Sequence, residues 1–181
     1  MKNEINARWI TTTAVFVALL IAVQAFTAPF GQYVTGSLVN LILITSVMTC
    51  GLASGVTVAT ISPVLAKLIG IGPFWAIVPF ILAGNIVLVI IWHYIGDKKW
   101  INVYFSRVIT IIAAAAGKCA LLYIGVVLIL IPYVLLLPEP QATVVAGLFS
   151  INQLFTAAIG GTVATIILPV IEKARGARSK K

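Results

Sequence analysis

Charged residues are scarce in this chain. Of its 181 residues, only 9% are Asp, Glu, Lys or Arg, whereas about a quarter of a typical soluble domain is charged. Hydrophobic residues make up 61%, well above the roughly 45–50% of soluble proteins. No Ser-, Pro- or Gly-rich linker divides the sequence. The composition therefore excludes an ordinary soluble domain and predicts one membrane-embedded domain over residues 1–181.

Acidic residues are the rarest of the charged groups. The chain has four of them, and Glu4, Asp97, Glu139 and Glu172 all lie at the ends of apolar runs or between them. A proton-coupled carrier usually needs a buried acid or a histidine relay, although a sodium site can be built from backbone carbonyls. Membrane enzymes that act on lipid phosphates generally need metal-binding carboxylates within the membrane. The distribution of acids therefore disfavours both classes.

Motifs for catalysis and cofactor binding are also absent from the sequence. The two cysteines, Cys50 and Cys119, stand alone within apolar stretches, without CxxC spacing or a histidine partner. The sequence has no P-loop, no HExxH motif and no GxSxG motif. We therefore predict a protein that is not an enzyme, with no catalytic residue, no metal ligand and no cofactor.

Long apolar runs separated by turn-rich links predict an all-α bundle of six transmembrane helices. A bilayer core of about 30 Å needs about 20 apolar residues in a helix. Pro63 lies within the third run and predicts a kink, because proline lacks the N–H of the helical hydrogen bond. The predicted spans are approximately 9–26, 37–50, 55–70, 75–95, 103–137 and 142–171, followed by a basic tail over 172–181.

The basic residues predict the orientation of this bundle. The net charge of +8 comes from residues at the two termini and in one short loop, so they do not form the basic face that nucleic-acid binding needs. Lys67, one turn inside the third span, is the exception on the opposite side. The positive-inside rule then predicts that both termini are cytoplasmic. We expect Trp9 and Trp92 at the inner interface and Phe30 and Trp75 at the outer one. The basic residues assigned to the inner side are Lys2, Arg8, Lys98, Lys99, Arg107, Lys173, Arg175, Arg178, Lys180 and Lys181.

Polar side chains within the spans are few, and their depths converge on the outer half of the membrane. Lys118 lies about 20 Å into the fifth span, so we expect an anionic or carbonyl-bearing ligand as its counter-group. Lys67 has the alternative of snorkelling to the outer interface. Asn40 and Asn85 have the alternative of hydrogen-bonding between helices. The predicted substrate-binding residues are Gln32, Tyr33, Asn40, Lys67, Trp75, Asn85, Lys118, Asn152 and Gln153.

Small residues form a row along the first span. Ala14, Ala18 and Ala22 recur at a spacing of four, which puts them on one face of a helix. Such a face lets another helix approach closely, and in lipid this close approach drives association. The row either packs against the helices of this chain or docks a partner. Ala157 and Gly161 on the sixth span have the same spacing, and packing within the chain is the stronger interpretation there.

These features together resemble the substrate-binding S component of an energy-coupling factor (ECF) transporter. The resemblance rests on six spans in 181 residues, the alanine row at 14–22, a short second span and a basic tail. It extends over nearly the whole chain. The stretches that look like those of spans 2 to 4 in such proteins are 35–40, 51–55, 61–63, 70–73 and 84–85.

The resemblance implies a specific role in the cell membrane of a bacterium or archaeon. S components bind a vitamin or similar micronutrient from outside, in a pocket capped by the link between spans 1 and 2. They dock through the alanine face, here Ala14, Ala18 and Ala22, onto a transmembrane coupling subunit driven by two cytoplasmic ATPases. Toppling of the S component then exposes the pocket inward.

Two other classes remain open at the level of sequence. A self-sufficient secondary carrier or small channel predicts an inverted repeat, and spans 1–3 and 4–6 show no evident self-similarity. A membrane-embedded enzyme or assembly factor is disfavoured by the lack of acids and metal ligands within the spans.

Overall fold

The computed structural model describes residues 7–72, 74–98 and 102–178. Lys2, Lys99, Lys180 and Lys181 of the predicted inner side lie outside these residues. Within the described ranges, all regular elements are helical. They are α1 (Ala7–Thr27), η1 (Ala28–Phe30), α2 (Gln32–Cys50), α3 (Leu52–Leu68), η2 (Trp75–Ile77), α4 (Val78–Ile95), α5 (Val103–Leu122), the π-helical η3 (Tyr123–Leu135), α6 (Glu139–Leu148) and α7 (Ile151–Arg178).

The helices confirm an all-α multi-pass membrane protein. Five helical stretches are apolar and long enough to cross a bilayer: Trp9–Phe30, Gln32–Cys50, Trp75–Ile95, Val103–Leu135 and Glu139–Ala174. The predicted span at 55–70 corresponds to α3, an apolar helix of 17 residues that continues through Pro63. At 1.5 Å per residue α3 is about 26 Å long, slightly shorter than a bilayer core.

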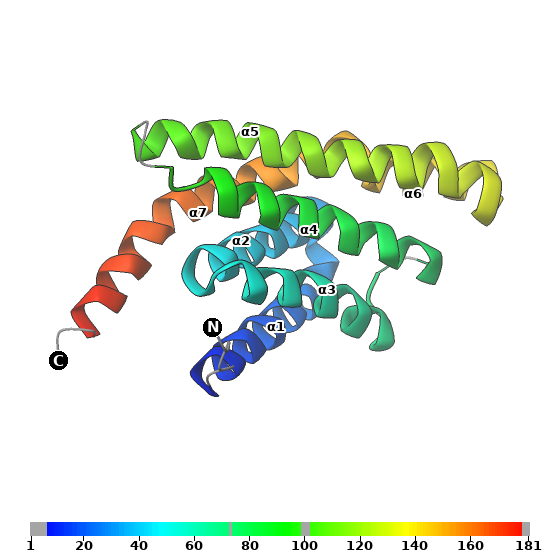
Figure 1. Ribbon diagram of the computed structural model, residues 1–181. Coiled ribbons are helices and arrows are strands. Elements are labelled where there is room, and N and C mark those ends of the chain that lie inside the picture. The colour runs from blue at the N-terminus through cyan, green and yellow to red at the C-terminus, as the bar shows by residue number, and fades with distance from the viewer. Residues whose placement is uncertain (1–6, 73, 99–101, 179–181) are drawn as a thin grey trace.

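The beginning of α1 and the end of α7 lie at the same end of the bundle (Figure 1). The α2–α3 and α4–α5 connections lie at that end too, whereas the links from α1 to α2 and from α3 to α4 lie at the opposite end. This arrangement follows from short links, because consecutive helices joined by a few residues must run antiparallel.

Two of the predicted spans differ from the helices. The second begins at Gln32 rather than near residue 37, because Gly31, with φ of 85°, turns the chain immediately before α2. The segment 142–171 is divided between α6 and α7 by Phe149 and Ser150. Hydropathy stays high across this break, so the apolar pattern alone predicts one helix.

The bundle has a largely apolar surface, and several polar side chains are buried inside it. Ile112 and Ile166 are more than 60% exposed on the helix surfaces, whereas Asn40, Arg107 and Lys118 are at most 4% exposed. A soluble protein buries the first kind of side chain and exposes the second. The inverted distribution is that of a protein whose helices face lipid, where polar groups must find partners within the protein.

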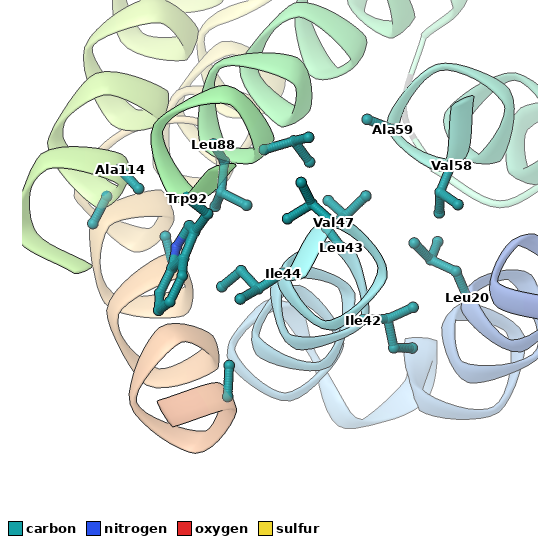
Figure 2. Close-up of a cluster of buried hydrophobic side chains, with 14 of the residues drawn as sticks. Leu20, Ile42, Leu43, Ile44, Val47, Val58, Ala59, Leu88, Trp92 and Ala114 are labelled. Atoms are coloured by element: carbon teal, nitrogen blue, oxygen red, sulfur yellow. The ribbon is translucent and has the colours of Figure 1, made fainter. Parts of the chain in front are cut away.

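Helix α2 lies at the centre of the core (Figure 2). Its Leu43 and Ile44 are fully buried, and Trp92 of α4 lies beside them against α7. A Cβ atom on Gly161 would lie 3.2 Å from the Trp92 ring. The expectation that Trp92 belongs to an interfacial belt is therefore wrong, because the small residue on α7 gives its indole a buried site.

Glycine brings α2 and α7 to backbone contact. A Cβ atom on Gly160 would lie 2.6 Å from the Ser37 carbonyl oxygen and 3.0 Å from the Leu41 nitrogen. Ala157, three residues earlier on α7, is buried as well. These contacts confirm that the small residues of the sixth span pack within the chain, the close approach that membrane helices use in place of a hydrophobic driving force.

A buried arginine, Arg107, connects three elements at the end of the bundle that lies opposite the α1–α2 link. Arg107 of α5 donates to Asp97 Oδ1 from Nε at 3.2 Å and from Nη2 at 2.9 Å. Its Nη2 also lies 3.4 Å from Glu172 Oε1, and its Nη1 donates to the Thr165 carbonyl. Asp97 lies in the turn between α4 and α5. It is half-exposed, but it also neutralises a guanidinium that is 2% exposed.

We predict that Gly160→Ala destabilises the protein. The added methyl group meets backbone atoms that cannot move aside, and overpacking of this kind costs about 1–3 kcal/mol. Gly147→Ala in α6 is the matched control, because nothing lies within 4 Å of its added Cβ and alanine favours a helix. Thermal unfolding in detergent compares the two variants. A melting temperature equally unchanged in both would contradict the close contact of α2 and α7.

We also predict that Asp97→Asn destabilises the protein more than Glu139→Gln does. Asparagine leaves the buried guanidinium with a weaker acceptor, and hydrogen bonds to charged groups contribute about 1.5–3 kcal/mol. Glu139 is exposed in the first turn of α6, where a carboxylate contributes about 0.3–1 kcal/mol through the helix dipole. The measurement is again thermal unfolding. Equal losses would show that Arg107 does not depend on Asp97.

Candidate functional site

A cavity of about 160 Å³ lies between α1, α2, α3, α4, α5 and α7. Its polar lining residues include two lysines, and its remaining walls are mostly aliphatic. The lining residues are Gln24, Gln32, Thr35, Gly36, Val39, Pro63, Ala66, Lys67, Ile71, Gly72, Val78, Ile81, Asn85, Lys118, Leu122, Phe149 and Gln153.

Helical periodicity explains why these residues meet. Gln32, Thr35 and Val39 lie three and four residues apart on α2, and Val78, Ile81 and Asn85 do so on α4. Residues at these spacings share one face of a helix. The shallow members of each set belong to the helix ends at the α1–α2 and α3–α4 links, so the cavity lies toward the end of the bundle opposite the two termini.

The deepest polar group of the cavity is the Lys118 ammonium. Its Nζ donates to Asn40 Oδ1 at 2.6 Å and to Asn85 Oδ1 at 2.8 Å. Lys118 is 4% exposed, and both asparagines are buried. Lysine at the centre of a membrane helix is unfavourable by about 2.5–3.5 kcal/mol, so an unpaired ammonium would not persist there. Two amide dipoles from α2 and α4 supply the stabilisation.

The positions of the amide groups are themselves held by neighbours. Asn40 Nδ2 donates to Thr156 Oγ1 at 3.4 Å, which directs its Oδ1 toward Lys118. Gly84 on α4 has no side chain, and a Cβ atom there would lie 3.4 Å from Lys118 Cγ. The same Cβ atom would lie 3.1 Å from Leu122 Cγ, so α5 packs closely against α4 beside the lysine stem.

The link from α3 to α4 forms the cavity wall beside Lys67. Gly70 N–H donates to the Lys67 carbonyl and Ile71 N–H donates to the Ala66 carbonyl, which is a Schellman cap with Gly70 at φ of 83°. Lys67 Nζ lies 3.4 Å from the Gly72 carbonyl oxygen. Lys67 thus reaches the end of the bundle, in agreement with the snorkelling alternative, and still contributes its stem to the cavity.

The α6–α7 break supplies the far wall of the cavity. Gln153 Nε2 donates to the Leu148 carbonyl at 2.9 Å, which satisfies a carbonyl that the end of α6 leaves without a helical partner. Phe149 is buried at the break and lines the cavity. The break therefore places both an aromatic ring and an amide where a continuous helix would place neither.

The structure brings together some of the predicted site residues and leaves others outside. Gln32, Lys67, Asn85, Lys118 and Gln153 line the cavity, and Asn40 contacts it through Lys118. Other predicted residues lie apart from this lining. Tyr33 donates to Asn152 Oδ1 at 2.5 Å in a contact between α2 and α7. Trp75 is 53% exposed. Tyr33, Asn152 and Trp75 do not line the cavity.

Several hydroxyl side chains within the spans donate to their own helices. Thr45, Ser62 and Thr110 donate to the backbone carbonyls of Leu41, Val58 and Ser106. This bonding to the preceding turn removes these hydroxyl groups from competition for a ligand.

The alanine row of α1 lies outside the protein's own contacts. Ala14, Ala18 and Ala22 are all exposed, whereas Thr13 and Leu20 on the opposite face of α1 are buried. Thr13 Oγ1 lies 2.8 Å from Ser54 Oγ of α3. The row therefore does not pack against the other helices that the structure describes.

Three features of the site escaped the sequence analysis. Gln24 in the last turns of α1 lines the cavity, and its isolated polarity in an apolar run was an available signal. Nothing in the sequence except the similar depth of the three residues indicates the direct contact of Lys118 with both asparagines. Nothing in the sequence indicates the role of Phe149, because aromatic residues are common in apolar runs.

No family model, curated protein or solved structure matches the chain. The fold and the cavity alone define its class: an all-α multi-pass membrane protein with an internal cavity that contains a buried ammonium group. Among the described residues, no group of three or more His, Cys, Asp or Glu side chains is placed to hold a metal ion. The chemistry that the arrangement offers is hydrogen bonding and charge pairing with a small polar solute.

We predict that Lys118 and Asn85 are energetically coupled. Asn85→Leu removes one acceptor and Lys118→Met removes the charge, so the double variant should lose less stability than the sum of the single losses. A coupling of about 1–3 kcal/mol is expected for a hydrogen bond to a buried charge. Thermal and denaturant unfolding of the four proteins measures it. Lys67→Met is the matched control, since its Nζ lies near an exposed backbone carbonyl, and strict additivity for Lys118 and Asn85 would contradict the pairing.

Proposed function

We propose that this protein is the substrate-binding subunit of an ECF-type importer for a water-soluble vitamin or related small molecule. The observation that carries the proposal is the cavity, in which polar side chains from several helices converge around a buried cation. A packed structural core has no such space. A solute-sized cavity with a few convergent polar groups is the usual form of a ligand site.

The position of the cavity supports uptake from outside. It lies toward the end opposite the termini, and the positive-inside rule assigns the end with the termini to the cytoplasm. The first turn of α2 contributes Gln32 and Thr35 to the cavity lining, and Thr35 Oγ1 donates to the Thr27 carbonyl across the α1–α2 link. A solute from outside would meet these residues first.

The exposed alanine row supports a partner. Ala14, Ala18 and Ala22 leave a smooth strip on α1 that no helix of this chain covers. Such a surface can face lipid. It can also pack against a helix of a coupling subunit, because small residues permit close approach. The chain has no nucleotide-binding motif, so the proposed ATP hydrolysis belongs to two partner ATPases.

Reconstitution tests the proposal. The protein is placed in proteoliposomes alone, or together with a coupling subunit and two ATPases from the same organism, and uptake of a solute that co-purifies with it is measured. The proposed role predicts binding by the protein alone and uptake only with the partners and ATP. Efficient uptake by the protein alone would instead identify a secondary carrier or channel.

We predict that Ala18→Trp blocks uptake and spares binding. An indole in the middle of the alanine row would hold a partner helix away, and uptake by the full complex should fall by at least about tenfold, which corresponds to ~1.4 kcal/mol. Solute binding by the protein alone should not change, because Ala18 is exposed and remote from the cavity lining. Ile112→Trp on α5, also exposed, is the matched control and should keep both activities. Normal uptake by Ala18→Trp would remove this face from docking.

A further inference from the structure

The cavity contains a buried positive charge and no negative one among the residues that line it. Lys118 supplies this charge, whereas the Lys67 ammonium lies beside the exposed Gly72 carbonyl at the end of the bundle. Neither Asp nor Glu is among the described lining residues. The acids that the structure describes lie elsewhere: Asp97 and Glu172 bind Arg107, and Glu139 is exposed on α6. The cavity therefore has a net positive field, which favours a negative solute.

The hydrogen bonds of Lys118 leave one donor for a solute. A lysine ammonium has three N–H groups, and among the described residues its partners are Asn40 Oδ1 and Asn85 Oδ1. Both partners are neutral, so they orient the ammonium without cancelling its charge. A single anionic oxygen at the third N–H completes the coordination and pairs the charge.

The cavity volume limits the size of the solute. At about 160 Å³ it is close to the ~150 Å³ of an apolar cavity that holds one benzene molecule. Val39, Ile81 and Leu122 give it aliphatic walls, and Phe149 adds an aromatic one. A flat ring of six atoms fits between such walls with room to spare, whereas a fused pair of rings leaves much less clearance.

We infer that this site takes a compact monocyclic anion, with one ring between the apolar walls and a single carboxylate or equivalent acidic group on the Lys118 ammonium. This inference rests on the proposed function, because it takes the cavity to be the solute site. It narrows that function by charge and by size, because the Lys118 ammonium disfavours cations and the volume of the cavity favours one ring over two.

Three probes of matched structure test the inference on the purified full-length protein. Benzoate has one ring and a negative charge, benzylammonium has one ring and a positive charge, and 2-naphthoate has the same carboxylate on two rings. Binding is measured by thermal stabilisation and by equilibrium titration. We expect benzoate to bind at least about tenfold more tightly than either of the others. Equal or tighter binding of benzylammonium or 2-naphthoate, or no binding of benzoate, would overturn the inference.

Two variants test the part assigned to Lys118. Lys118→Met should abolish the benzoate response. Asn85→Asp has the same shape as wild type and places a carboxylate against Lys118, so it should fold normally and weaken benzoate binding by at least about tenfold. Unchanged benzoate binding by a folded Asn85→Asp protein would overturn the role of the ammonium.

The failure of this inference differs from the failure of the proposed function. Mass spectrometry of molecules released from the purified protein identifies its solute independently of the probes. A cationic or bicyclic solute that is taken up with ATP and partners would overturn the inference and leave the importer role intact. Uptake of a monocyclic anion by the protein alone would support the inference and overturn the importer role.

Discussion

The hydrogen bonds of Lys118 to Asn40 and Asn85 are the contacts on which the interior of this protein depends. No water is available within a bilayer to form hydrogen bonds with a charged group, so the protein must supply its hydrogen-bond partners. Here they come from α2 and α4, and the lysine comes from α5. One side chain thereby fixes the relative rotation and depth of three helices. Asn40 extends the network to α7 through Thr156.

A second buried cation, Arg107, lies at the other end of the bundle and is stabilised by a different kind of partner. Arg107 is as deeply buried as Lys118, but its partners are two carboxylates, which cancel its charge. These ion pairs neutralise the guanidinium and connect the α4–α5 turn to α7. The amide partners of Lys118 orient a charge and leave it uncancelled. The two buried cations therefore differ in that only the charge of Arg107 is paired with carboxylates.

The sequence predicted the parts of this architecture that depend on composition and on depth along a helix. The six apolar runs, the polar residues at similar depths and the common helix face of the three alanines follow from linear spacing, whereas the exposure of that face does not. The rotation of each helix about its axis and the local breaks in the helices do not follow from linear spacing. Trp75 and Trp92 both looked interfacial, yet one is exposed and the other buried, because a glycine on α7 makes room for the second. The α6–α7 break and the π-helical η3 are decided by contacts between helices, such as Phe80 against Gly125, that a hydropathy profile does not contain.

Helix α1 presents two faces that serve different neighbours. Thr13, Leu20 and Gln24 face the bundle and the cavity, whereas Ala14, Ala18 and Ala22 face outward. Substitutions on one face leave the other chemically unchanged. The residues that line the cavity and the strip that α1 presents to the membrane can therefore change independently of each other.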